Sequence, residues 1–409
     1  MSAAQPGNES LQNGDDRSPE HGLSKLSLSS QTIHADDFLN EGQDVAPPLH
    51  VSTTFRYNKN PDALVAWGER DPHAPLDGHI YSRHSAPNTT RFEAILSSIF
   101  KGPTLTYASG LSAFHALLVF LNPKRISIGE GYHGCHGVIG IHQKLTGLKK
   151  LDLNCDPEEL QAGDVVHIET PINPYGTATN LKAFAEKAHS RGAYLTVDAT
   201  FGPPPLQDPF LWGADIVMHS GTKVQEGWFQ KLEAERLHLG NVMGSMEGWL
   251  GIRSVRTLEV RVERQSSNAG KIVAWLNAAL HPEKASSVDV VSSEDSKVVQ
   301  SVLAKIEHAS LQEDDIKDGW LLKQMPNGFG PVFSITLREK GFARRLPSKL
   351  DLFHHATSLG GVESLIEWRT MTDSLVDSRL LRVSVGLEGW EDLRDDLLSG
   401  FKAIAAETK

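Results

Sequence analysis

The sequence predicts an α/β protein, with a mainly parallel sheet in a large domain and a smaller α+β domain toward the C-terminal end. Three apolar runs, Val165–Glu169, Tyr194–Asp198 and Ile216–His219, have the length and β-branched character of buried strands. Segments with helical periodicity alternate with short apolar runs from about residue 90 onward. Such alternation indicates parallel strands covered by helices on both faces, since each parallel crossover needs a helix-length connection.

The N-terminal part of the chain has a different character. Residues 1–30 are polar and carry few large apolar side chains, which predicts a disordered tail. An ordered arm is expected to begin near Thr32, with Ala46–Phe55 extended and Asp71–Gly78 forming a loop rich in Pro, Asp and Gly. These features predict a tail at 1–30 and an arm at 31–80.

The remaining elements divide between two expected domains, 81–265 and 266–409. In the first, the pattern predicts helices over Arg91–Phe100, Leu111–Phe120 and Leu181–Ser190, the last with Asn180 as N-cap and Gly192 as terminator, and a strand over Thr104–Ala108. In the second, it predicts a helix over Ser266–Leu280 and strands over Val332–Leu337, Ala356–Gly361 and Leu381–Gly386.

Composition excludes several classes of function. The net charge of −11 over 409 residues argues against nucleic acid or an anionic membrane as partner. No apolar run is long enough to cross a bilayer, and the N-terminus resembles neither a signal peptide nor a transit peptide. The 2 cysteines imply no disulfide framework, and the histidines show no convincing metal spacing. We therefore expect a cytoplasmic enzyme without a metal site.

The pentad His-Ser-Gly-Thr-Lys, which ends at Lys223, is the strongest chemical signal. It places a lysine just after a buried strand, with the hydroxyls of Ser220 and Thr222 beside it. Pyridoxal phosphate (PLP) enzymes need a lysine whose amine forms a Schiff base with the cofactor's aldehyde, and hydroxyls that hold its phosphate. A lysine after a strand is more often a solvated surface residue. The pentad therefore indicates a PLP site only in combination with other residues of the chain.

Two further requirements of PLP are also met. Asp198 ends a predicted strand and is the candidate that faces the ring nitrogen, although a strand-end Asp often only caps a turn. Gly110 and Leu111 stand at a strand–Gly–helix turn whose amides suit a phosphate, although an ordinary tight turn explains the glycine equally well.

Aromatic and cationic candidates complete the set. Tyr132, in a glycine-rich loop, is the candidate to stack on the ring, but such a tyrosine is more often a loop anchor. Arg382, in an apolar run, suits a substrate carboxylate, or alternatively a structural ion pair.

Together these residues resemble the Cys/Met-metabolism PLP enzymes, a family that includes cystathionine γ-synthase and the cystathionine lyases. The similarity runs from about residue 32 to 400, and its landmarks occur in the family's order. They are Tyr81-Ser-Arg83 with Asn88-Thr, Ala108-Ser-Gly-Leu-Ser-Ala113, Glu169-Thr-Pro-Ile-Asn-Pro174, Val197-Asp-Ala-Thr-Phe201, His219-Ser-Gly-Thr-Lys223, Ser358-Leu-Gly-Gly-Val-Glu-Ser-Leu365 and Arg382-Val-Ser-Val-Gly-Leu-Glu388.

The resemblance implies the aspartate-aminotransferase-like fold (fold type I) and a role for each landmark. Lys223 would carry PLP and shuttle protons, with Tyr132 as its catalytic companion on the ring. The other cofactor-binding residues would be Asp198, Asn173, Gly110, Leu111, Ser220, Thr222, Tyr81 and Arg83, and the substrate-binding residues Arg382, Ser358 and Asn173. Tyr81 and Arg83 would reach the phosphate of a neighbouring subunit, which implies shared active sites in a dimer of dimers.

Three segments depart from the family's pattern. After Lys223, Val-Gln-Glu-Gly-Trp-Phe-Gln already looks like a helix, so that a loop and one core strand seem to be missing. Tyr-His-Gly-Cys at 132–135 replaces the usual Tyr-Gly-Gly-Thr, and Ile-Glu-Trp-Arg at 366–369 stands where many members carry Pro and Thr-His. The last two segments are expected to touch the substrate.

The predicted function is PLP-dependent trans-sulfuration, which cleaves or forms the C–S bond of cystathionine-like amino acids. One alternative is γ-replacement on an O-acyl-homoserine with an unusual nucleophile, which the altered loops suggest. The other is a catalytically silent paralogue or truncated form, which the shortened segment after Lys223 suggests.

Overall fold

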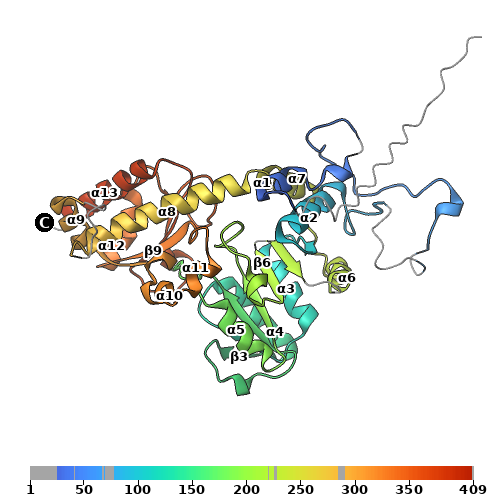
Figure 1. Ribbon diagram of the computed structural model, residues 1–409, viewed down its shortest axis with the longest axis horizontal. Helices are drawn as coiled ribbons and strands as arrows, with labels where there is room; N and C mark the ends of the chain where they lie inside the picture. Colours follow the sequence, from blue (N-terminus) through green and yellow to red (C-terminus); the bar gives the residue numbers. More distant parts are fainter. Residues whose placement is uncertain are drawn as a thin grey trace, which may run out of the picture.

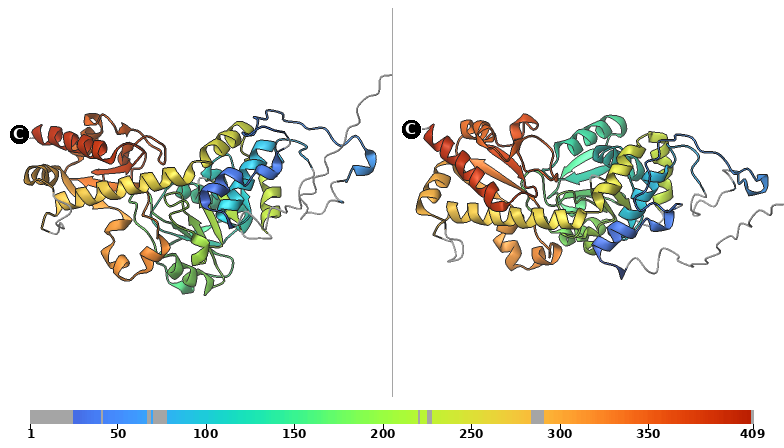
Figure 2. Two further views of the ribbon diagram at one scale, coloured as in Figure 1. Left: turned by 45° about the horizontal axis from the view of Figure 1, so that its top comes forward. Right: turned by 90° about the horizontal axis from the view of Figure 1, so that it is seen from above.

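The structure is a computed structural model, and it describes residues 25–40, 42–66, 69, 78–219, 228–283 and 291–407, together with the backbone of 221–224. Two sheets organise the chain, and the long helix α8 (Leu258–Leu280) runs from the helices beside the first sheet to the second sheet (Figures 1 and 2). The expected boundary between 265 and 266 falls inside this helix, so the division into two domains at that residue stays a prediction. In the described part of the chain, no helix is both long and apolar enough to cross a membrane.

The first sheet has seven strands in the order β1-β7-β6-β5-β4-β2-β3. The strands are β1 (Thr104–Leu105), β2 (Arg125–Ile128), β3 (Lys149–Asp152), β4 (Val165–Glu169), β5 (Tyr194–Asp198), β6 (Ile216–His219) and β7 (Gly221–Val224). From β3 to β6 the neighbours are parallel, and β7 is antiparallel to both β6 and β1. The predicted mainly parallel sheet is therefore confirmed.

Helices cover both faces of this sheet, as expected. Alternate residues of β4 explain why: Val165 packs in one apolar cluster with helices α3 and α4, whereas Val166 packs in another with α5. The helices that accompany this sheet are α2 (Pro87–Phe100), α3 (Gly110–Leu121), α4 (His133–Thr146), α5 (Leu181–His189), α6 (Phe229–Leu239) and α7 (Ser245–Val255). The predicted N-cap is correct, since Oδ1 of Asn180 accepts the N–H of Ala183 at 3.2 Å.

The second sheet has five strands in the order β10-β11-β12-β9-β8. The strands are β8 (Leu303–Glu307), β9 (Val332–Leu337), β10 (His354–His355), β11 (Leu365–Trp368) and β12 (Leu380–Ser384). Its helices are α9 (Ser293–Val302), α10 (Glu313–Lys317), α11 (Trp320–Gln324), α12 (Lys340–Arg345) and α13 (Trp390–Ala406). Helices α8, α9 and α13 share one apolar core with the sheet, as an α+β unit requires.

Short 3-10 helices connect the larger elements. They are η2 (Asp37–Leu39), η3 (Pro61–Ala63), η5 (Pro157–Glu159), η6 (Pro209–Trp212), η7 (Ala309–Leu311), η8 (Leu346–Lys349) and η9 (Arg369–Met371). The last of them, η9, follows β11 directly and matters for the site.

The N-terminal arm begins earlier than expected. Helix α1 (Leu28–His34) includes Leu28–Ser30, which the sequence assigned to the tail, while residues 1–24 lie outside the described residues. The buried carboxylate of Asp36 fixes the helix by ion pairs with Arg91 and Arg256, both at 3.1 Å. Beyond it the arm extends away from the body (Figure 1). The expected extended segment pairs only through an isolated bridge between Thr54 and Tyr81.

Two predictions about strands are wrong, one of a strand at 356–361 and one of a missing strand after Lys223. Ala356–Gly361 is a loop between β10 and β11, and not a strand, because Ser358 and Gly360 adopt positive φ angles of 80° and 73°. The core strand that seemed to be missing after Lys223 is present, because Gly221–Val224 itself folds back as β7 between β6 and β1. The backbone at this point is therefore paired on both sides, which removes the expected hole in the sheet.

Candidate functional site

A cavity of about 500 Å³ opens where the carboxyl ends of β4, β5 and β6 face the second sheet. Ligands of open α/β sheets bind at this edge. The residues that line the cavity come from both halves of the chain: Ser109, Gly110, Leu111, Tyr132, His133, Cys135, Glu169, Asn173, Asp198, Thr200, Phe201, Met218, His219, Thr357, Ser358, Leu359, Arg369, Thr372 and Arg382. The cavity thus brings together most of the predicted site residues whose side chains are described.

Asp198 is the last residue of β5 and is almost completely buried. Its Oδ1 accepts the N–H of Thr200 at 3.0 Å. Burial raises the pKa of the Asp198 carboxyl, since a low-dielectric site disfavours the charged form. A positively charged N–H in the cavity would compensate for that cost, and a protonated pyridine nitrogen is such a group.

Glu169 stands opposite Asp198 in the register of β4 and β5. Its two carboxylate oxygens accept backbone N–H groups from Tyr132 at 2.7 Å and from Asn173 at 2.9 Å. Burial and the nearby charge of Asp198 raise the pKa of Glu169 to about 8. The sequence named Glu169 only as part of a motif, and its role in positioning two other predicted residues was missed.

The turn predicted to hold a phosphate begins helix α3. Gly110 is the first residue of α3, with Leu111 second, and both line the cavity. The side chain of Ser109 caps the helix by accepting the N–H of Ser112 at 3.1 Å. Amides at a helix N-terminus bind anions, so this turn suits a phosphate group.

Tyr132 reaches the cavity because Gly134 has no side chain. A Cβ at Gly134 would lie 2.6 Å from the Tyr132 ring and 2.9 Å from the Leu111 side chain. The glycine therefore allows the tyrosine ring to lie against the start of helix α3. Cys135 follows it in helix α4, and burial raises the pKa of its thiol far above the ordinary range.

Arg382 is buried in β12 and connects the two halves of the site. Its Nη1 donates to Oδ1 of Asn173 at 3.1 Å, and its Nη2 donates to the carbonyl oxygen of Ser358 at 3.1 Å. The Nη2 atom also lies 2.7 Å from Oε2 of Glu367. Three predicted residues, Arg382, Asn173 and Ser358, are thus in direct contact.

Lys223 follows β6 closely, as the sequence predicts, but it stands within a strand and not in a turn. Its backbone lies within β7, opposite Val217 of β6 and Thr104 of β1. The side chains of Lys223 and Thr222, and the whole of Ser220, lie outside the described residues. Their predicted contacts with a cofactor therefore stay predictions.

Tyr81 and Arg83 lie outside the cavity of their own chain. Both belong to the segment that pairs with the arm at Thr54, and the Arg83 guanidinium stacks over the Tyr81 ring at 5.1 Å. Tyr81 is 39% exposed. Their expected contact with a neighbouring subunit stays a prediction.

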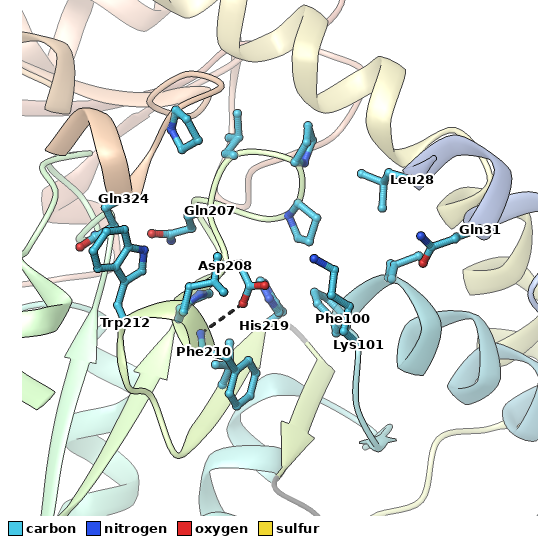
Figure 3. Close-up of a pocket in the computed structure, with 18 of the residues that line it drawn as sticks. Leu28, Gln31, Phe100, Lys101, Gln207, Asp208, Phe210, Trp212, His219 and Gln324 are labelled. Carbon is cyan, nitrogen blue, oxygen red and sulfur yellow. Dashed lines mark hydrogen bonds between the residues drawn. The ribbon is translucent and has the colours of Figure 1, made fainter. Parts of the chain in front are cut away.

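A second cavity, of about 430 Å³, lies between α1, the end of α2 and the loop after β5 (Figure 3). Phe100 and His219 stack at its wall, with ring centroids 4.6 Å apart, and Oδ1 of Asp208 accepts the N–H of Phe210 at 3.2 Å. None of the predicted site residues with described side chains lines it. The predicted site residues with described side chains that line a cavity thus gather around Asp198 and not here.

A family model for the Cys/Met metabolism PLP-dependent enzymes matches residues 29–402. The chain belongs to this family. It is 29% identical over 422 aligned positions to cystathionine gamma-synthase of Escherichia coli, covering 92% of this chain and 99% of that one. It is 30% identical over 410 positions to cystathionine beta-lyase of Lactococcus lactis, covering 91% of this chain and 98% of that one.

Solved structures give the same result for the fold. Methionine gamma lyase of Micromonospora echinospora superimposes with a TM-score of 0.75 at 27% identity, covering 92% of this chain and 100% of that one. The metB protein of Corynebacterium glutamicum superimposes with a TM-score of 0.78, covering 93% and 99% of the chains, and at 23% identity it supports the fold alone. The predicted family, the predicted α/β fold and the predicted cofactor, PLP, are confirmed.

The donor set of the cavity fits PLP. The amides at the start of α3 suit the phosphate, Asp198 suits the ring nitrogen, and the Tyr132 ring borders the space between them. Among the described residues, neither the Asp198 nor the Glu169 carboxylate accepts a hydrogen bond from a basic side chain. Burial raises the pKa of both carboxyl groups. A cationic ring would lower that electrostatic cost.

Proposed function

We propose that this PLP-dependent enzyme cleaves or forms the C–S bond of cystathionine-like sulfur amino acids. The observation that carries the proposal is the meeting of Asp198, at the end of β5, and Arg382, on β12, in one cavity. The first group suits the cofactor ring and the second suits an amino-acid carboxylate. The relatives named above as a synthase and a lyase support this class of reaction.

Each predicted residue has a proposed role. Bound PLP supplies an electron-withdrawing ring that stabilises negative charge at the substrate's α-carbon. Lys223 would hold the cofactor, and its amine would move the proton at the substrate's α-carbon. Asp198 would keep the ring nitrogen protonated, and Tyr132 would stack on the ring. Gly110, Leu111, Ser220 and Thr222 would hold the phosphate.

Arg382 is proposed to bind the α-carboxylate of the substrate. A guanidinium group binds a carboxylate through two parallel N–H donors, which fixes the orientation as well as the position of the amino acid. Asn173 and the Ser358 carbonyl oxygen already hold the two Nη atoms of Arg382. These contacts orient the guanidinium group before the substrate binds, so the Arg382 side chain loses less conformational entropy on binding.

We further propose that the active site is shared between subunits. Tyr81 and Arg83 would contribute to the phosphate site of a neighbour, within a dimer of dimers. The extended arm supports this proposal, because Val45 and Val51 are 97% and 78% exposed and would be buried against a second subunit. The cytoplasm is the proposed location, and cell fractionation tests it.

The test is turnover of L-cystathionine by the PLP-loaded protein. Cleavage on the γ side releases cysteine, 2-oxobutanoate and ammonia, whereas cleavage on the β side releases homocysteine, pyruvate and ammonia. Synthase activity would instead form cystathionine from an O-acyl-homoserine and cysteine. A PLP-loaded protein that does none of these would contradict the proposal.

The relatives do not favour either alternative raised by the sequence, since those named above are a synthase and a lyase of ordinary sulfur amino acids. The missing-strand argument for a silent paralogue is also weakened, because β7 completes the sheet.

A further inference from the structure

Two residues of the cavity stand where the chain departs from its family's pattern. His133 belongs to the altered tyrosine loop, and Arg369 ends the altered segment Ile-Glu-Trp-Arg. The first begins helix α4 beside the first sheet, and the second begins η9 beside the second sheet. Nη2 of Arg369 nevertheless lies 3.2 Å from Nδ1 of His133. The two departures therefore form one contact across the site.

The guanidinium group of Arg369 is buried, with the residue only 2% exposed. Its Nη1 donates to Oγ1 of Thr372 at 2.7 Å and lies 3.2 Å from Oε2 of Glu367. That same oxygen lies 2.7 Å from Nη2 of Arg382. One carboxylate thus faces two guanidinium groups, which places a second cation next to the residue proposed to bind the α-carboxylate.

Arg369 retains donor capacity toward a ligand. Its Nε is buried and has no hydrogen-bond partner among the described residues. Asp373 lies 4.0 Å from Nη2, which is too far for a hydrogen bond. A buried N–H without an acceptor destabilises a protein, so the protein alone does not fully satisfy this guanidinium group, and Arg369 is among the residues that line the cavity.

His133 contributes a donor of defined tautomer. Every nitrogen of a guanidinium group is a donor, so Nδ1 of His133 accepts from Arg369. The proton of the neutral ring is then on Nε2. Since His133 is exposed and lines the cavity, this N–H is available to a ligand at the edge of the site.

We propose that Arg369 and His133 form a second anion-binding subsite, which receives an anionic group at the far end of the substrate's side chain. The inference rests on the proposed function, because Arg382 must take the α-carboxylate for the side chain to point toward Arg369. The substrate class is then an amino acid with a second carboxylate or similar anion, in preference to a neutral thioether.

The test compares two amino acids whose side chains have the same length, L-2-aminoadipate and L-norleucine. Only the first carries a terminal carboxylate. Their affinities for the PLP-loaded enzyme are measured by titration calorimetry and as inhibition constants. The wild type should bind L-2-aminoadipate roughly ten- to a hundredfold more tightly, the range expected for hydrogen bonds to a charged group.

Variants decide whether Arg369 is responsible. Arg369→Met should abolish the preference by lowering the affinity for L-2-aminoadipate far more than the affinity for L-norleucine, which can change slightly because Glu367 also pairs with Arg382. Arg369→Lys should restore part of the preference. His133→Ala, at an exposed position, should reduce the preference without affecting the fold. Arg379→Met is the matched control, because that arginine is exposed and pairs with Asp377 outside this cavity.

Two results would overturn the inference: a wild type that binds both amino acids equally, or an Arg369→Met variant that loses affinity for both to the same degree. The proposed function fails separately, through absence of cystathionine turnover, which is a different measurement.

Discussion

Oε2 of Glu169 accepts the backbone N–H of Tyr132 at 2.7 Å, at the base of the cofactor cavity. The other oxygen of the carboxylate accepts the N–H of Asn173. One side chain at the end of β4 therefore sets the position of Tyr132, which is proposed to stack on the cofactor ring, and of Asn173, which contacts Arg382. The backbone positions of Tyr132 and Asn173 thus depend on the buried carboxylate of Glu169.

This buried acid makes the stability of the cofactor-free protein depend on pH. Glu169 has a pKa of about 8 in the folded chain, against an ordinary value of 4.5. The folded state then holds a proton that the unfolded state loses, so the stabilisation is complete below about pH 4.5 and disappears as the pH rises through about 8. We expect Tm to fall between about pH 5 and 8. The slope should be smaller in Glu169→Gln, and equal slopes would contradict this assignment.

Asp198→Asn should weaken cofactor binding and catalysis together. The amide has a similar shape but no charge to compensate a protonated ring nitrogen. Loss of one partner of a buried, hydrogen-bonded charge pair costs about 2–5 kcal/mol. PLP affinity from equilibrium dialysis and kcat for cystathionine should both fall. Unchanged values for both would remove Asp198 from the cofactor site.

Gly134→Ala should impair PLP binding more than folding. The added methyl group would collide with the Tyr132 ring and with Leu111 and displace the ring from the cavity. Gly140→Ala is the matched control, since it lies in the same helix α4 and a Cβ there meets nothing within 4 Å. That control should gain roughly 0.5–1 kcal/mol of stability from helix propensity. Equal PLP affinities in the two variants would contradict the role of Gly134.

Arg382→Lys should raise KM for the amino-acid substrate while the PLP spectrum stays normal. Lysine keeps the charge but loses the two-pronged fork, so the expected rise is roughly tenfold or more. Arg394→Lys, at a position on the outer helix α13, serves as the control. If both variants show the wild-type KM, the α-carboxylate binds elsewhere.

The strands that carry the site were predictable from the sequence. Val165–Glu169, Tyr194–Asp198 and Ile216–His219 are found at the predicted residues, because each is a short apolar run of β-branched residues closed by a polar one. Strand β9, Val332–Leu337, was predicted for the same reason. Local pattern suffices where a strand is buried on both faces.

Features that depend on distant partners were not predictable. Strand β7 exists because residues around Lys223 pair with β1 and β6, which no local pattern reveals. The segment that ends at Arg369 was expected to touch the substrate, but the sequence does not reveal that Arg369 is buried against Glu367 and against His133, 236 residues away. The loop at Ser358 carries apolar residues, but its positive φ angles prevent a strand.

The most direct test of the account is reduction of the PLP-loaded protein with borohydride, followed by mapping of the label. The visible absorption band should disappear, and the reduced pyridoxyl group should be found on Lys223. The Lys223→Ala variant should remain unlabelled at this position. A folded, PLP-saturated protein that shows no such band, or carries the label on another lysine, would contradict the claim that Lys223 in β7 holds the cofactor.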